Sequence, residues 1–263
     1  MNKLDFKISL FLSFICFISG FFVLPYQLDI LQRTLPNQYD EFIGTIPLPI
    51  NLLILVTSFQ LFFISFGLSL IGIKLARKTG FSLNIFTSLF NKEKVSLNKK
   101  SVLLSVIFGV FIALIISGAD RFYYQYQIPL IRENTPEFSF LALLVGVLYG
   151  GFFEEILLRL FFMSLLIWIF QKIFNRNKSS LNNKYYWIAI VISAALFAAG
   201  HLPATEMLFG ELSTNLIVRC FLLNGTGGLL FGYLYWKKGF EYAVLAHMVS
   251  HISLQLLFIP LFY

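Results

Sequence analysis

Seven long apolar stretches constrain this chain more than any other feature of its sequence. They lie at 8–24, 50–73, 101–118, 138–170, 185–201, 214–236 and 242–259. A transmembrane α-helix needs about 20 consecutive apolar residues, within a range of roughly 17–25. Stretches of this length therefore predict an all-α fold, a polytopic transmembrane helical bundle with seven spans.

The composition favours a membrane protein over a soluble one. Of the 263 residues, 58% are hydrophobic and 13% are charged, whereas about a quarter are charged in soluble domains. So much apolar surface must be covered by a lipid bilayer. The net charge of +7 resides mainly between apolar stretches, with no basic run among exposed aromatics. This pattern argues against a nucleic-acid partner.

The distribution of Lys and Arg predicts the orientation. With the N-terminus in the cytoplasm, 15 of these residues fall in cytoplasmic segments, and only Arg33, Arg121 and Arg132 fall in outer loops. Cytoplasmic loops of membrane proteins carry such an excess of positive residues. We therefore expect a multi-pass protein of the cell membrane, with its N-terminus and the loop at 74–100 in the cytoplasm.

The first and fourth spans carry possible interruptions. The first is expected to end at Pro25. The fourth is too long for a simple crossing, so it is tilted, extended into the cytoplasm, or broken near Gly150-Gly151. If it is broken, the number of spans becomes eight.

Six ionisable residues lie in or at the edge of these spans, where charge is expensive and usually functional. They are Glu154, Glu155 and Arg159 in the fourth span, His201 at the end of the fifth, and His247 and His251 in the seventh. At 1.5 Å per residue, Glu155, His201 and His251 lie roughly 20–24 Å from the cytoplasmic ends of their helices. These three are therefore expected at one level, with His247 one turn nearer the cytoplasm.

Helical spacing separates the roles of these residues. Glu155 and Arg159 are four apart on one helix face, which predicts a buried ion pair. Glu154 is rotated away from this pair and is a candidate general base. The spacing of His247 and His251 lets two imidazoles face one metal ion or one reacting group.

Two polar or small-residue features elsewhere have simpler interpretations. Arg219 lies about five residues into its span and is expected to extend to the outer interface, as long cationic side chains do. Gly228 and Gly232 predict close helix packing.

Three segments resemble the motifs of a known family. The family is the CPBP or Abi family, which comprises the CAAX-protease and bacteriocin-processing intramembrane peptidases. Its EExxxR motif is similar to GGFFEEILLRLFF at 150–162. Its FxxxH motif is similar to FAAGH at 197–201, and its last motif region to GGLLFGYLYWKKGFEYAVLAHMVSH at 227–251. The order and spacing also agree, over roughly 140–255.

The resemblance implies an intramembrane endopeptidase that hydrolyses a peptide bond. It assigns the water-activating glutamate to Glu154, and the second glutamate and the arginine of the motif to Glu155 and Arg159. The two motif histidines correspond to His201 and His247.

The resemblance also implies a division of the chain. We expect N-terminal transmembrane helices over 1–137 and a CPBP-like catalytic helical core over 138–263, within one membrane domain.

One position departs from the family pattern. The family usually has Asn or Asp four residues after its last histidine, where this chain has His251. In a metal-free mechanism, Glu154 is the base, assisted by His201, and His247 and His251 donate to the oxyanion. In a zinc mechanism, the three histidines hold the metal and Glu154 acts on its bound water. We favour the metal-free mechanism, which needs no cofactor, because the family's usual Asn or Asp makes a poorer zinc site. The zinc mechanism stays an alternative.

Other function classes stay open as well. The main alternative is a non-hydrolytic bacteriocin self-immunity or maturation scaffold. A small ion transporter would use the Glu-His set as a proton relay, but no pair of broken, repeated helices supports it. For the peptidase, the expected partner is a membrane-associated peptide or protein substrate, such as a precursor.

Overall fold

The computed structural model describes residues 2–174 and 181–263. Within them every regular element is helical, and seven helical runs are long and apolar enough to cross a membrane. They are Lys3–Thr34, Ile50–Thr79, Lys99–Gln127, Phe140–Phe174, Asn183–Phe209, Thr214–Lys237 and Phe240–Phe262. The predicted all-α bundle of seven spans is confirmed, and the chain is a multi-pass membrane protein.

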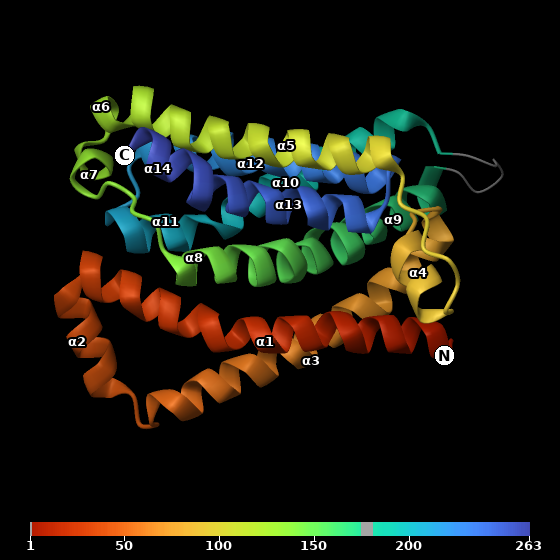
Figure 1. Ribbon diagram of the computed structural model, residues 1–263, viewed down its shortest axis with the longest axis horizontal. Coiled ribbons are helices and arrows are strands. Elements are labelled where there is room, and N and C mark those ends of the chain that lie inside the picture. Colours follow the sequence, from red (N-terminus) through yellow and green to blue (C-terminus); the bar gives the residue numbers. More distant parts are fainter. Residues whose placement is uncertain (1, 175–180) are drawn as a thin grey trace.

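The helical runs extend along one long axis, with the two termini at opposite ends of the bundle (Figure 1). The lysine-rich end holds the start of α1 (Lys3–Thr34), α4 (Asn84–Phe90) and the end of α12 (Thr214–Lys237). The distal end holds α2 (Pro36–Thr45), η1 (Asp120–Tyr124), α6 (Gln125–Gln127), α7 (Pro129–Glu133), α11 (Leu202–Phe209) and α14 (Ile259–Phe262).

The first span does not end at Pro25, so that prediction is wrong. α1 continues through this proline to Thr34. Proline removes one backbone donor, but a transmembrane helix tolerates it where neighbouring groups satisfy the freed carbonyl. α1 packs closely on α3 (Ile50–Thr79), because a Cβ atom on Gly20 would overlap with Ser58.

The fourth run is a single helix, so of the three alternatives for this long span, a break at Gly150-Gly151 is not found. It consists of α8 (Phe140–Val145), the π-helical segments η2 (Gly146–Glu154) and η3 (Ile156–Met163), and α9 (Ser164–Phe174). The two glycines lie inside η2, where the helix is widened but continuous.

The segment before α5 (Lys99–Ala119) is bonded to the start of α13 (Phe240–Ser253). The N–H of Phe240 donates to the carbonyl of Ser82 at 3.0 Å. The carboxylate of Glu241 accepts the N–H of Phe86, also at 3.0 Å. These bonds hold the segment across the lysine-rich end.

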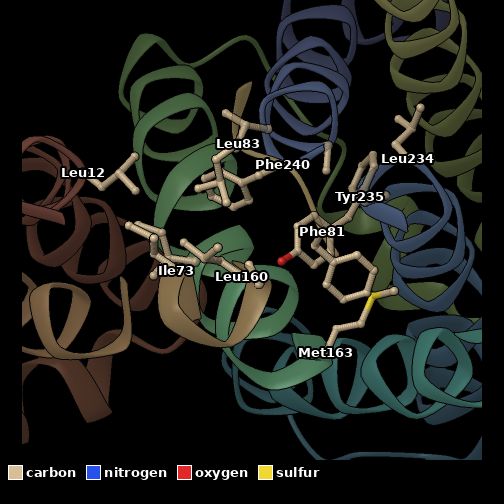
Figure 2. Packing of buried hydrophobic residues seen from close by; sticks show 14 of the residues in the cluster. Leu12, Ile73, Phe81, Leu83, Leu160, Met163, Leu234, Tyr235 and Phe240 are labelled. Carbon is tan, nitrogen blue, oxygen red and sulfur yellow. The ribbon is translucent and has the colours of Figure 1, made fainter. Parts of the chain in front are cut away.

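A cluster of buried hydrophobic side chains packs between the helices (Figure 2). It includes Leu12, Ile73, Phe81, Leu83, Leu160, Met163, Leu234, Tyr235 and Phe240. By contrast, Phe63, Leu103 and Phe140 are more than 60% exposed. Large apolar side chains exposed in this number fit helices that face lipid.

Close packing between α10 (Asn183–Gly200) and α12 confirms the expectation for the small residues. A Cβ atom on Gly228 would lie 2.7 Å from the Cα of Ala194, and one on Gly232 would lie 3.1 Å from Ile190. The glycines therefore allow the two helices to approach.

Arg219 forms an ion pair with Asp120 at the distal end, a partner that the sequence did not predict. Its Nε donates to Asp120 at 2.6 Å, and both side chains are about 14% exposed or less. A carboxylate 99 residues away in the sequence holds the guanidinium inside the bundle.

Candidate active site

The charged residues of the fourth run lie at the junction of its two π-helical segments. Glu154 ends η2, Glu155 is the single residue between the segments, and Arg159 lies within η3. Short π-helical insertions in longer helices occur frequently at functional sites. One helix thus brings two consecutive glutamates to the interior of the bundle.

Glu155 and Arg159 form the buried ion pair that their spacing predicts. Arg159 Nη1 lies 3.1 Å from Glu155 Oε1, and both side chains are fully buried. The guanidinium lies over the rings of Phe197 and Phe231, 4.8 and 5.5 Å from their centroids. Its Nη2 donates to the carbonyl of Gly228 at 3.3 Å. Arg159 therefore connects the fourth run to α10 and α12.

His247 of α13 lies between the two glutamates. Its Nδ1 is 2.9 Å from Glu155 Oε1, and its Nε2 is 3.7 Å from Glu154 Oε2. Glu155, which is paired with Arg159, accepts the Nδ1–H of the imidazole, so Nε2 faces Glu154. Phe231 stacks on the imidazole, with ring centroids 4.6 Å apart, and supports its plane.

This arrangement corrects the predicted level of the histidines. Glu155 was expected level with His251, with His247 one turn away, but it hydrogen-bonds to His247. The estimate assumed a regular α-helical rise, which the two π-helical segments of the fourth run do not have.

His201 approaches Glu154 from the end of α10. Its Nδ1 lies 2.8 Å from the carbonyl oxygen of Phe197, and its Nε2 lies 4.0 Å from Glu154 Oε1. Glu154 therefore lies between the Nε2 atoms of His201 and His247. Separations of 3.7 and 4.0 Å are too long for direct hydrogen bonds but suit a bridging water.

His251 stacks on His247, with ring centroids 5.2 Å apart and planes 19° apart. Two glycines of the fourth run make room for these imidazoles. A Cβ atom on Gly146 would overlap with the His251 ring. One on Gly150 would lie 2.9 Å from His251 Nε2 and 3.2 Å from His247 Nε2. Gly146 and Gly150 are thus part of the site, although neither was predicted as a site residue.

A cavity of about 50 Å³ borders all three histidines. A water molecule occupies roughly 30 Å³ in the liquid, so the cavity can admit water. Asn224 and Ser250 also border it, and neither was predicted. The signal for Asn224 was in the sequence, since an amide inside an apolar span requires a polar partner.

The histidines as placed do not fit a zinc ion. In the described parts of the chain, no group of three His, Cys, Asp or Glu side chains is arranged to hold a metal. The ring of His251 lies parallel to that of His247 instead of converging on a shared point. The mechanism below therefore uses no metal.

A family model matches the part of the chain that builds this site. Residues 136–253 match the model of the family described as type II CAAX prenyl endopeptidase Rce1-like. This segment belongs to the CAAX endopeptidase family. The resemblance inferred from the three motifs is confirmed.

Searches of curated proteins and of solved structures gave no significant match. All six predicted site residues lie within the segment that belongs to the CAAX endopeptidase family. Membership supports an intramembrane endopeptidase in general terms, acting on a membrane-embedded protein substrate. It assigns no chemical role to any single residue.

Proposed function

We propose that this protein hydrolyses a peptide bond of a membrane-associated protein or peptide precursor, with Glu154 as the water-activating base. The main support is the position of Glu154 between the Nε2 atoms of His201 and His247, two histidines that border a cavity large enough for water. A peptidase inside a membrane must admit water, hold a base and stabilise an oxyanion.

In the first step, a water molecule between Glu154 and His247 attacks the carbonyl carbon of the substrate. Its oxygen forms the new C–O bond, one proton passes to the Glu154 carboxylate, and the carbonyl oxygen becomes an oxyanion. Because the Nδ1–H of His247 donates to Glu155, the free Nε2 accepts the other water hydrogen. His201 presents its Nε2 in the same way, since its Nδ1–H donates to the Phe197 carbonyl.

In the second step, protonated Glu154 gives its proton to the nitrogen of the scissile bond. The C–N bond then breaks and releases an amine and a carboxylic acid. We assign oxyanion stabilisation to His251, whose ring nitrogens make no hydrogen bond with any residue that the structure describes. His247 is less suited to this role because its ring proton is directed to Glu155.

We also propose that the protein lies in the cell membrane with its lysine-rich end in the cytoplasm. The support is the excess of Lys and Arg at that end. The distal end, which adjoins the cavities, then faces outward.

Mass spectrometry of peptides from cells with wild-type protein and with Glu154→Gln tests this function. We expect specific cleavage products that are lost in Glu154→Gln but retained in Glu206→Gln. The latter is a matched change at an exposed glutamate of α11. If Glu154→Gln retains the products, Glu154 is not the base. If no product depends on the protein and Glu154→Gln retains its cellular function, a non-hydrolytic scaffold is the better explanation.

A further inference from the structure

The cavity beside the histidines adjoins a larger one toward the distal end. The larger cavity has a volume of about 400 Å³, within the roughly 300–1,000 Å³ range of ligand pockets. Ile116 and Leu254 line both cavities. Two apolar side chains therefore separate a pocket of ligand size from the proposed catalytic groups.

The walls of the larger cavity are polar as well as apolar. The ion pair between Asp120 and Arg219 lines it, and so does the pair between Asp29 and Arg33, whose Oδ1 and Nη2 atoms are 3.0 Å apart. Burying charged groups against a hydrocarbon chain is costly. These walls therefore offer a polar chain charged partners between apolar side chains.

A length of non-helical backbone borders the same cavity. Residues 135–138 are neither helix nor strand, and Thr135 and Glu137 line the cavity. In the described chain, the N–H groups of these two residues make no hydrogen bond to protein. Free backbone groups of this kind can pair with an extended peptide. The nature of the wall thus favours a polypeptide ligand.

In the opposite direction from the site, the described side chains are tightly packed. Arg159 is followed by Leu160 and Met163, which have no exposed surface. Tyr235 and Phe240 are also fully buried and belong to the same packed cluster (Figure 2). A peptide could reach Glu154 from the lysine-rich end only by displacing this core.

On the basis of the proposed function, we infer that the substrate is a polypeptide segment on the outer side of the membrane, which reaches the site through the distal cavity. The segment lies extended beside residues 135–138. Its scissile bond reaches Glu154 by passing between Ile116 and Leu254. The described residues offer a cytoplasmic tail no such route, because their packed core lies between the lysine-rich end and the site.

Thiol labelling of the full-length protein tests this route without measuring cleavage. Ala142→Cys lies in the larger cavity and Ser250→Cys beside the histidines. In intact cells, a membrane-impermeant thiosulfonate should label both. Ser105→Cys is a fully buried position on α5. It should react at least about tenfold more slowly than the two cavity positions, because buried thiols are unreactive. The wild-type protein is the blank, since Cys16 and Cys220 are buried.

Ser96→Cys, an exposed position at the lysine-rich end, reports the orientation. It should be labelled only in inverted vesicles. Labelling of Ser250→Cys only in inverted vesicles would overturn the route, as would labelling of Ser96→Cys from the same side as Ala142→Cys. The pattern should be the same in a Glu154→Gln background. The route can therefore fail while the peptidase activity holds, and the activity can fail while the route holds.

Discussion

The two halves of the bundle, on either side of Arg159, differ in how their interiors are filled. Toward the lysine-rich end, apolar side chains such as Leu160 and Tyr235 are fully buried and leave a packed core. Toward the distal end, cavities of about 50 and 400 Å³ follow one another, and the ion pair between Asp120 and Arg219 lines the second. The proposed catalytic groups lie where the packed half meets the hollow half.

The two halves hold groups with different structural requirements. Groups that need a fixed geometry, Glu155 and Arg159, lie on the packed side, where neighbouring side chains hold them. Glu154 and His201, which must meet water, are partly exposed on the hollow side. His247 contacts both glutamates and links the two halves. A catalytic group is more effective when supporting side chains lock its orientation.

Glu154→Gln should give the largest loss of cleavage. A loss of stability in this variant would contradict the difference between the packed and hollow halves. Without the base, peptide cleavage should fall by about 10²–10⁴-fold, the usual contribution of general base catalysis. The melting temperature in detergent should hardly change, because Glu154 makes no buried ion pair with Arg159. A large fall in melting temperature with cleavage retained would contradict its place on the hollow side.

Arg159→Met should act mainly on stability, whereas Glu154→Gln should act mainly on cleavage. Arg159→Met leaves the Glu155 carboxylate buried without its guanidinium partner, and breaking a buried pair costs about 3–5 kcal/mol. The melting temperature should therefore fall much more than in Glu154→Gln, the matched change at the neighbouring site. Thermal unfolding of both variants in detergent measures this. Equal and negligible shifts would show that the packed half does not depend on the pair.

Gly150→Ala should have a smaller effect, confined to the junction of the two halves. The added methyl group would lie 2.9 Å from His251 Nε2 and 3.2 Å from His247 Nε2. Forcing an extra methyl group into a packed site typically costs about 1–3 kcal/mol. Cleavage should fall, since the displaced imidazoles lose their alignment with Glu154. The control is Gly225→Ala in α12, where nothing lies within 4 Å of the new atom. Equal activity of the two variants would contradict the proposed packing.

The packed half was more predictable from the sequence than the hollow half. The number of spans follows from apolar length, and the pairing of Glu155 with Arg159 follows from their spacing along one helix. Both depend on residues that are close in sequence. The π-helical segments are not visible in the apolar pattern, and they shifted the level at which the carboxylates meet His247.

The features missed on the hollow side depend on distant partners. Asp120 is 99 residues from Arg219, and no periodicity links the two. Gly146 and Gly150 were not recognised because their role depends on imidazoles of another helix. The cavities result from side chains of several helices, which a one-dimensional pattern cannot place.

His251→Asn should have the smallest effect, and it separates the metal-free mechanism from the zinc mechanism. His251 makes no ion pair with a carboxylate in the described chain, and an amide still offers a donor to the oxyanion. We therefore expect cleavage near the wild-type level and insensitive to a chelator. His247→Asn, the same change one turn away, should abolish cleavage because it removes the partner of Glu155. If zinc were held by the histidines, both variants would lose metal and activity together, since loss of one ligand displaces the metal. Metal analysis of the purified wild-type protein and both variants, with cleavage measured before and after chelation, distinguishes the two mechanisms.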